Sequence, residues 1–123
     1  MILAILNVGT VHLVESNQRK CAFLREVART TQTSVEIHND RIEHLNPWPV
    51  DVITARGVAP LAKLLKLSRS FVTEDSTCLF LKGQDIDREL TKAAKYWKMS
   101  IDQMPSVADP RGMILRLTRV SHV

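Results

Sequence analysis

The chain has 123 residues, of which 45% are hydrophobic and 24% charged, and this composition excludes collagen-like, low-complexity and strongly disordered proteins. The apolar start over residues 1–6 is too short to cross a membrane and lacks the basic segment and cleavage site of a signal peptide, so neither a membrane anchor nor secretion is expected. The net charge of +4 is compatible with a polyanionic partner and does not require one.

Two cysteines, Cys21 and Cys78, lie inside apolar runs and lack the spacing of a metal site. We therefore expect buried free thiols and a reducing, cytoplasmic location. The length allows one domain at most, with a sizeable hydrophobic core.

Hydrophobic periodicity predicts helices and strands that follow one another along the chain. The expected elements are, in order, helix 1–7, strand 11–15, helix 18–30, strand 34–38, a single helical turn at 42–45, strand 50–55, helix 60–71, strand 76–81, helix 87–97, strand 99–107 and strand 113–120. Such alternation predicts an α/β fold with a mostly parallel sheet. A tight turn over residues 109–112 would make the last two strands an antiparallel hairpin, which favours a methyltransferase-type fold over a dehydrogenase.

The strand over residues 11–15 is apolar on both faces and ends in a carboxylate, Glu15. In nucleotide-binding α/β units such a carboxylate accepts hydrogen bonds from ribose hydroxyls, and a Gly-rich loop precedes it by about 20 residues. Only fourteen residues precede Glu15, and they contain no such loop, so we expect the sequence to begin just after it. The alternative is that Glu15 and Ser16 cap the following helix.

Three further positions follow predicted strands, where open α/β sheets bind their ligands. Ile42 and Glu43 could supply an apolar face and an acceptor for a purine ring, or could belong to a solvated turn. Arg56 could pair with the carboxylate of an amino-acid group, or point to solvent. Lys82 could contact phosphate or base, or lie on the surface.

Other kinds of site find no support in the sequence. There is no P-loop, no nucleophile elbow and no acid–base pair. Trp48 and Trp97 are more typical of packing than of base stacking. No metal site is expected from the histidines, which are His12, His38, His44 and His122. Their spacing does not match that of metal ligands, and none has a cysteine or carboxylate at a suitable distance along the sequence.

Five short segments together resemble the motifs of one family, the RsmG (GidB) family of bacterial small-subunit ribosomal RNA guanine-N7 methyltransferases. They are residues 14–27 (VESNQRKCAFLREV), 41–43 (RIE), 54–61 (TARGVAPL), 81–83 (LKG) and 111–112 (RG), and they occur in the family's order at compatible spacing. The resemblance covers residues 1–120. It implies a class I, Rossmann-like fold that depends on S-adenosylmethionine, with a C-terminal antiparallel hairpin.

The resemblance also implies roles for particular residues. Those around the cofactor are Glu15, Ile42, Glu43 and Arg56, and those facing the RNA are Lys82, Arg111 and Arg19. The implied reaction transfers a methyl group from S-adenosylmethionine to guanine N7 in 16S ribosomal RNA. Because N7 already exposes a lone pair, no catalytic base is needed, and catalysis rests on alignment of the reactants and on basic residues that hold the RNA.

Members of this family carry an N-terminal helical segment, a strand and a Gly-rich loop that have no counterpart here. We therefore expect residues 1–123 to be the C-terminal portion of a methyltransferase domain that lacks the first strand and binds S-adenosylmethionine weakly or not at all. The missing strand would be replaced by pairing of strands 11–15 and 51–55, or its loss would cause self-association through exposed sheet edges. The alternatives are a non-catalytic RNA-binding remnant and half of an NAD-dependent dehydrogenase.

Overall fold

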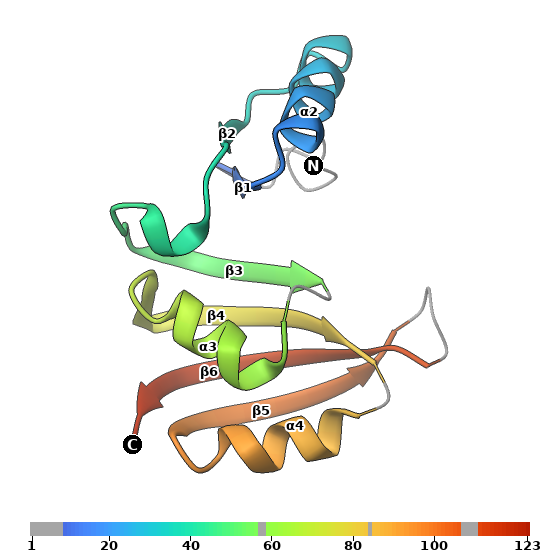
Figure 1. Ribbon diagram of the computed structural model, residues 1–123. Helices are drawn as coiled ribbons and strands as arrows, with labels where there is room; N and C mark the ends of the chain where they lie inside the picture. Colours follow the sequence, from blue (N-terminus) through green and yellow to red (C-terminus); the bar gives the residue numbers. More distant parts are fainter. Residues whose placement is uncertain (1–8, 57–58, 84, 107–110) are drawn as a thin grey trace. The chain divides into compact units, whose positions relative to one another are not determined.

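The computed structural model describes residues 9–56, 59–83, 85–106 and 111–123. The chain forms two compact units, Met1–Asn46 and Pro47–Val123 (Figure 1), and each is described by itself. The helix expected over residues 1–7 lies outside the described residues, as does most of the turn expected at 109–112. None of the described helices has the length and apolar run that crossing a membrane would need.

The first unit is a two-stranded parallel sheet with one helix connecting its strands. Its elements are β1 (His12–Val14), α2 (Gln18–Thr30), β2 (Glu36–His38) and a 3-10 turn, η1 (Ile42–His44). Helix α2 begins where the sequence predicts because the Asn17 side chain accepts a hydrogen bond from the Lys20 amide at 3.0 Å. On α2, Cys21 is buried and Leu24 half-buried, while Arg25 is exposed, as the 3.6-residue period requires.

The second unit is a four-stranded sheet with two helices. Its elements are β3 (Val50–Arg56), α3 (Leu61–Ser68), β4 (Val72–Lys82), α4 (Ile86–Ala93), β5 (Trp97–Pro105) and β6 (Met113–His122). The strand order is β3-β4-β6-β5, in which β3 and β4 are parallel and β6 is antiparallel to both of its neighbours. The predicted C-terminal hairpin is therefore confirmed.

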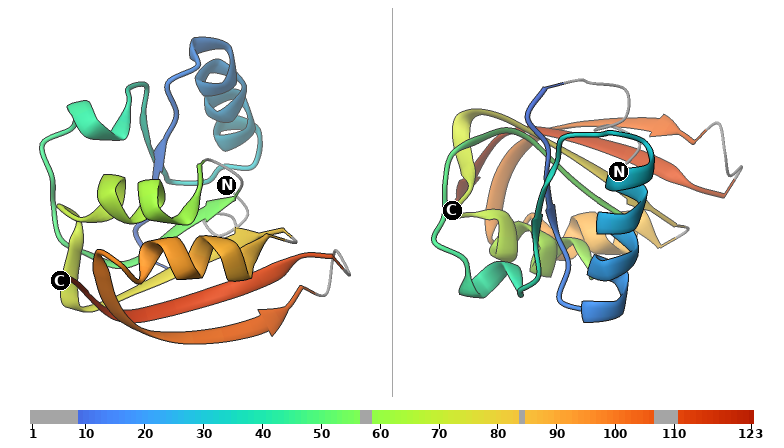
Figure 2. Two further views of the ribbon diagram at one scale, coloured as in Figure 1. Left: turned by 60° about the horizontal axis from the view of Figure 1, so that its bottom comes forward. Right: turned by 90° about the horizontal axis from the view of Figure 1, so that it is seen from above.

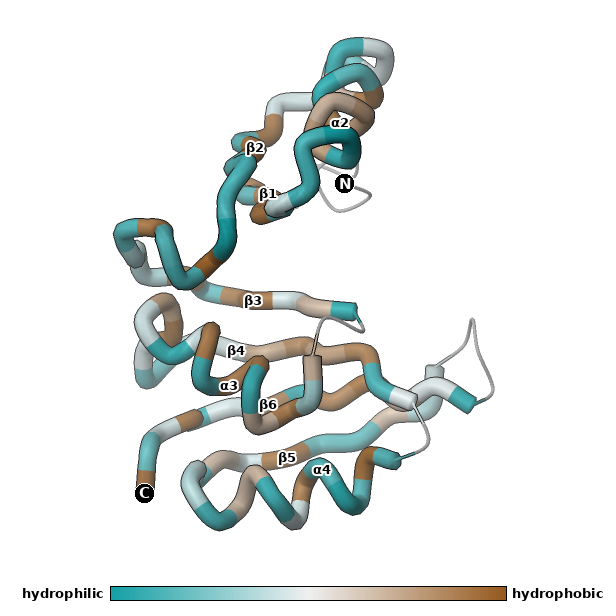
Figure 3. Tube along the Cα trace, viewed as in Figure 1, coloured by the Kyte–Doolittle hydropathy of each residue, from teal (hydrophilic) through white to brown (hydrophobic). Residues whose placement is uncertain are grey.

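Helices α3 and α4 lie on the same face of this sheet, as both views of Figure 2 show. Alternate residues of β4 and β6 point to that face and are fully buried: Cys78, Phe80, Leu115 and Leu117. They pack against leucines of α3 and against Ile86 and Ala93 of α4. Figure 3 shows the same pattern, with hydrophobic residues along β4 and on α3 and mixed polarity along α4.

One expectation about this unit is corrected. Helix α4 ends at Ala93, and not near Trp97, because the Trp97 indole is only 7% exposed and packs edge-on against His122 as the first residue of β5. Within their own units, β1 pairs with β2 and β3 pairs with β4. The pairing expected between strands 11–15 and 51–55 would join the two units and stays a prediction. Packing by the tryptophans is confirmed, since Trp48 contacts the Phe71 ring edge-on as well.

Both cysteines are free and buried, as the sequence predicts. Burial raises the pKa of the Cys78 thiol to about 11. An unfolded chain loses this proton near pH 9, so the thiol's contribution to stability is complete below pH 9 and is lost as pH rises through 11. Urea unfolding at several pH values should show this loss between pH 9 and 11, and the Cys78→Ala variant should show less of it. If the free energy of unfolding depends on pH equally in the unaltered chain and in Cys78→Ala, the raised pKa of the Cys78 thiol is refuted.

Candidate functional site

Glu15 lies at the carboxyl end of β1, held by three contacts. Its amide donates to the His38 carbonyl of β2 at 3.0 Å, and its own carbonyl accepts from the Cys21 thiol at 3.1 Å. Carboxylate oxygen Oε1 accepts from the Asn17 amide at 3.0 Å. The side chain is thus positioned by the strand on one side and by the first turn of α2 on the other.

The two carboxylate oxygens of Glu15 have different surroundings. Oε1 accepts from the amide of Asn17, the residue that caps α2, and so orders the turn that leads into this helix. Oε2 accepts no hydrogen bond from any residue in the described part of the chain. One oxygen therefore serves the fold, and the other can accept a hydrogen bond from a ligand hydroxyl.

Ile42 and Glu43 follow β2 in η1, and because β1 and β2 are parallel they come after the same edge of the sheet as Glu15. The Asp40 carboxylate accepts from the Arg41 amide at 2.8 Å and so orders the turn before η1. Ile42 is half-buried, whereas Glu43 is exposed with its carboxylate 3.8 Å from the Arg41 guanidinium. An apolar side chain and an accessible acceptor thus stand next to each other.

The basic residues predicted to act at strand ends lie mostly in the second unit. Arg56 is the exposed last residue of β3, and Lys82 ends β4, its parallel neighbour. Arg111 precedes β6, whose first residue, Met113, pairs with Lys82. These three residues therefore share one edge of the second sheet, while Arg19 is exposed on α2 of the first unit.

Lys82 is not a surface lysine. Its side chain is 7% exposed, and its ammonium donates to the Ala59 carbonyl at 2.7 Å and contacts the Glu89 carboxylate at 3.0 Å. The same Glu89 oxygen accepts from the Leu61 amide at 2.8 Å, which satisfies a free N–H at the start of α3. Lys82 and Glu89 together tie the segment after β3 to the start of α4. The RNA contact predicted for Lys82 would require this pair to open.

A cluster that sequence reasoning missed lies across β1 and β2. The register of the strands places His12 opposite Glu36 and Val14 opposite His38. His12 Nδ1 lies 2.9 Å from Glu36 Oε2 and 3.1 Å from His38 Nε2. Sequence spacing could not reveal this cluster, because parallel pairing brings together residues that are 24 to 26 positions apart in the chain.

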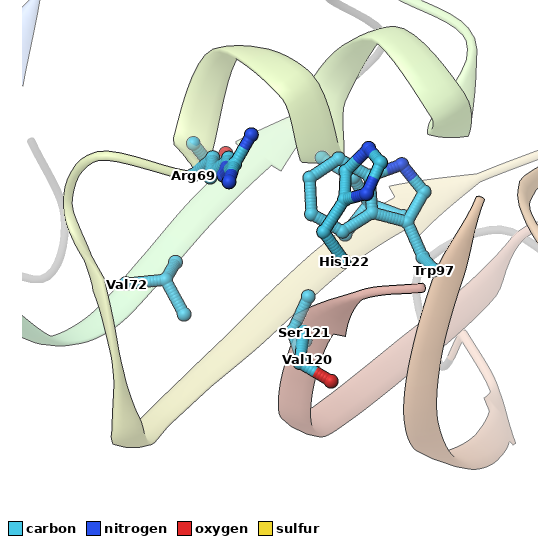
Figure 4. Close-up of a pocket in the computed structure, with 8 residues that line it drawn as sticks. Arg69, Val72, Trp97, Val120, Ser121 and His122 are labelled. Atoms are coloured by element: carbon cyan, nitrogen blue, oxygen red, sulfur yellow. The ribbon is translucent and has the colours of Figure 1, made fainter.

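The pocket in Figure 4 lies at the opposite end of the second sheet from Arg56 and Lys82. Its volume is about 190 Å³, and its walls include Trp97 and His122, with Arg69 at its rim. Ligands of open α/β sheets bind beyond the carboxyl ends of the parallel strands, and this pocket lies beyond the amino end of β4. It is therefore no candidate for the nucleotide site.

The family model described as "GidB: rRNA small subunit methyltransferase G" matches residues 1–113. A ribosomal RNA small subunit methyltransferase G from Paramagnetospirillum magneticum is 49% identical over 121 residues, which are 98% of this chain and 59% of that protein. The chain thus spans about three fifths of the length of this curated relative.

Two solved structures share the fold at low sequence identity. A ribosomal protein L11 methylase from Lactobacillus delbrueckii matches with a TM-score of 0.72 and 18% identity, over 96% of this chain and 64% of that one. Fibrillarin from Aeropyrum pernix, crystallised with natively bound S-adenosyl-L-methionine, matches with a TM-score of 0.67 and 19% identity, over 89% of this chain and 56% of that one. The expected class I methyltransferase fold is confirmed.

Proposed function

The chain belongs to the GidB family, rRNA small subunit methyltransferase G, and from this membership we propose that it takes part in transferring a methyl group from S-adenosylmethionine to guanine N7 of small-subunit (16S) ribosomal RNA. The observation that carries the proposal is the placement of Glu15, Ile42 and Glu43 after the same edge of the β1–β2 sheet. The family match removes the alternative of half a dehydrogenase.

The residues of the first unit fit the adenosine part of the cofactor. Glu15 offers Oε2 to the ribose hydroxyls while Asn17 keeps Oε1 in place. Half-buried Ile42 offers an apolar surface to the adenine ring, and Glu43 offers an acceptor for its amino group. The family resemblance assigns Arg56 to the cofactor pocket, where its guanidinium suits the carboxylate of the methionine part.

S-adenosylmethionine supplies an electrophilic methyl group on a sulfonium. The residues of this chain have no proton to remove, because guanine N7 carries a free lone pair. Their task is to bind and orient both reactants, and orientation alone can lower a barrier by several kcal/mol. We assign the holding of the RNA phosphates to Arg111 and Arg19 and keep Lys82 as a third candidate. Such a chain acts in the cytoplasm, where ribosomal subunits are.

The test is methyl transfer to unmodified 16S ribosomal RNA with radiolabelled S-adenosylmethionine. The cofactor is supplied at about millimolar concentration, so that binding of low affinity is also detected. We expect label at guanine N7, located by chain cleavage at that base, and less label with Glu15→Gln. RNA binding that weakens steeply with salt, with no label transferred, would support the non-catalytic RNA-binding alternative instead.

Arg111 carries a separate prediction about RNA affinity. Each phosphate contact on a single strand contributes about 0.7 to the slope of log affinity against log salt concentration. Arg111→Gln should therefore reduce the slope by a little under one, measured by fluorescence anisotropy with a labelled RNA. Lys98→Gln, an exposed lysine on β5 that the proposal does not use, is the control. Equal slopes for the chain and its Arg111→Gln variant would remove Arg111 from the RNA side.

Self-association through sheet edges is a further part of the proposal. In the described part of the chain, β3 pairs only with β4, and β1 only with β2, so each sheet has strands with one hydrogen-bonded neighbour. Sedimentation velocity at increasing protein concentration should show dimers or larger species. A chain that stays monomeric at all concentrations would refute self-association and leave the proposed methyl transfer unaffected.

A further inference from the structure

We propose that His12, Glu36 and His38 form a binding site for one divalent transition-metal ion, with zinc as the best match. Each of the three side chains offers one ligand atom, and all three atoms lie within 4.8 Å of one another. All three residues belong to the same two-stranded sheet, so the site depends only on the first unit. The inference is independent of methyl transfer.

The distances suit tetrahedral coordination. Ligand bonds of about 2.0–2.1 Å at a tetrahedral zinc ion place neighbouring ligand atoms about 3.3 Å apart. His12 Nδ1 lies 2.9 Å from Glu36 Oε2 and 3.1 Å from His38 Nε2. These two separations need to widen by only a few tenths of an ångström, while the Glu36 and His38 ligand atoms, which lie within 4.8 Å of each other, close by at most about 1.5 Å to complete the coordination shell. Two imidazoles and one carboxylate are a set that zinc uses in proteins.

The hydrogen bonds around His12 also call for a cation. His12 Nδ1 faces both a carboxylate oxygen and a ring nitrogen of His38, two atoms that can each present a lone pair. A neutral imidazole has a single N–H, which cannot point fully at both partners. A metal ion at the centre would bind all three lone pairs at once. The stacked rings of His12 and His38, with centroids 5.4 Å apart, keep the two imidazoles on the same face of the sheet.

The site is open enough to exchange an ion. The side chain of Glu36 is 62% exposed and that of His12 is 27% exposed, so the cluster opens to solvent on the carboxylate side. Three protein ligands leave a fourth position for water. An ion here would crosslink β1 to β2 next to Glu15, whose amide bonds to the carbonyl of His38.

Isothermal titration of the full chain with zinc chloride, in a buffer that does not coordinate metals, tests the proposal. We expect one ion per chain with micromolar or tighter affinity. His38→Ala and Glu36→Gln should each weaken binding at least about tenfold, since loss of even an outer-shell partner of a metal ligand costs 10- to 100-fold. The matched control is His44→Ala, which removes an exposed histidine 3.3 Å from Asp40 and should leave the affinity unchanged.

Cobalt supplies a second readout that does not depend on how well a variant folds. The cobalt-loaded chain should show visible absorption bands of a four-coordinate nitrogen–oxygen site, without a thiolate charge-transfer band. Absence of zinc binding, equal binding by the Glu36→Gln variant, or a thiolate band from Cys21 or Cys78 would overturn the proposal. The first of these outcomes would leave the cluster as a hydrogen-bonded pair of imidazoles beside a carboxylate.

Discussion

Lys82→Met is expected to lower the free energy of unfolding by about 3 kcal/mol, the cost of removing one partner from a buried ion pair. The Glu89 side chain is 20% exposed and would lose the ammonium 3.0 Å away, while the Ala59 carbonyl would lose its donor. Methionine keeps most of the volume of lysine, so the loss reports charge and hydrogen bonding more than packing. Urea unfolding followed by circular dichroism measures it.

An exposed ion pair on the same sheet provides the control. Arg116 and Asp102 lie 2.7 Å apart, but both side chains are more than half exposed, so Arg116→Met should cost at most about 1 kcal/mol. Lys82→Met combined with Glu89→Gln should recover part of the loss, because the unpaired charge is gone and the glutamine oxygen can still accept from the Leu61 amide. Equal losses for Lys82→Met and Arg116→Met would show that Lys82 is not held as described.

Glu15→Gln is expected to weaken binding of S-adenosylmethionine about 10- to 100-fold, because a hydrogen bond to a charged acceptor contributes about 1.5–3 kcal/mol. Glutamine keeps an oxygen to accept from the Asn17 amide, so the start of α2 should remain intact. Its NH2 group replaces the second carboxylate oxygen and cannot accept from a ribose hydroxyl. A titration followed by NMR measures affinities into the millimolar range.

The matched variant is Glu26→Gln on α2. Glu26 is an exposed carboxylate of the same unit that pairs with Arg29, so its substitution removes the same charge away from the sheet edge. Its affinity for S-adenosylmethionine should equal that of the unaltered chain. If Glu15→Gln and Glu26→Gln weaken binding of S-adenosylmethionine equally, the loss of affinity comes from the change in net charge, and the contact between Glu15 and the ribose is refuted.

The sequence predicted those helix and strand ends that are set by neighbouring residues in the chain. Helix α2 has the predicted ends because Asn17 caps it and the apolar period stops at Thr30. The end of α4 could not be predicted, because Trp97 enters β5 for packing against His122, a residue 25 positions away. Strand β4 likewise starts earlier than predicted, at Val72, where the Ser76 hydroxyl bonds both the Val50 carbonyl and the Thr73 amide.

The candidate site was predictable only to the extent that it follows strand ends. Glu15 ends one predicted strand, and Ile42 and Glu43 follow the next within five residues, so a search at the carboxyl ends of the strands finds all three. Glu89 gave no such signal, because its pairing with Lys82 depends on how α4 packs beside α3. The histidine cluster depends on the register of β1 against β2, which periodicity alone does not determine.

The most direct test of the central claim is NMR mapping of S-adenosylmethionine on the isotope-labelled chain. We expect the largest amide shifts at residues 15–17 and 41–44, where Glu15, Ile42 and Glu43 surround the adenosine part. Adenosine alone should shift the same amides. Shifts confined to the pocket near Trp97 and His122, or no shifts at millimolar cofactor, would contradict the claim that this sheet edge is the adenosine site.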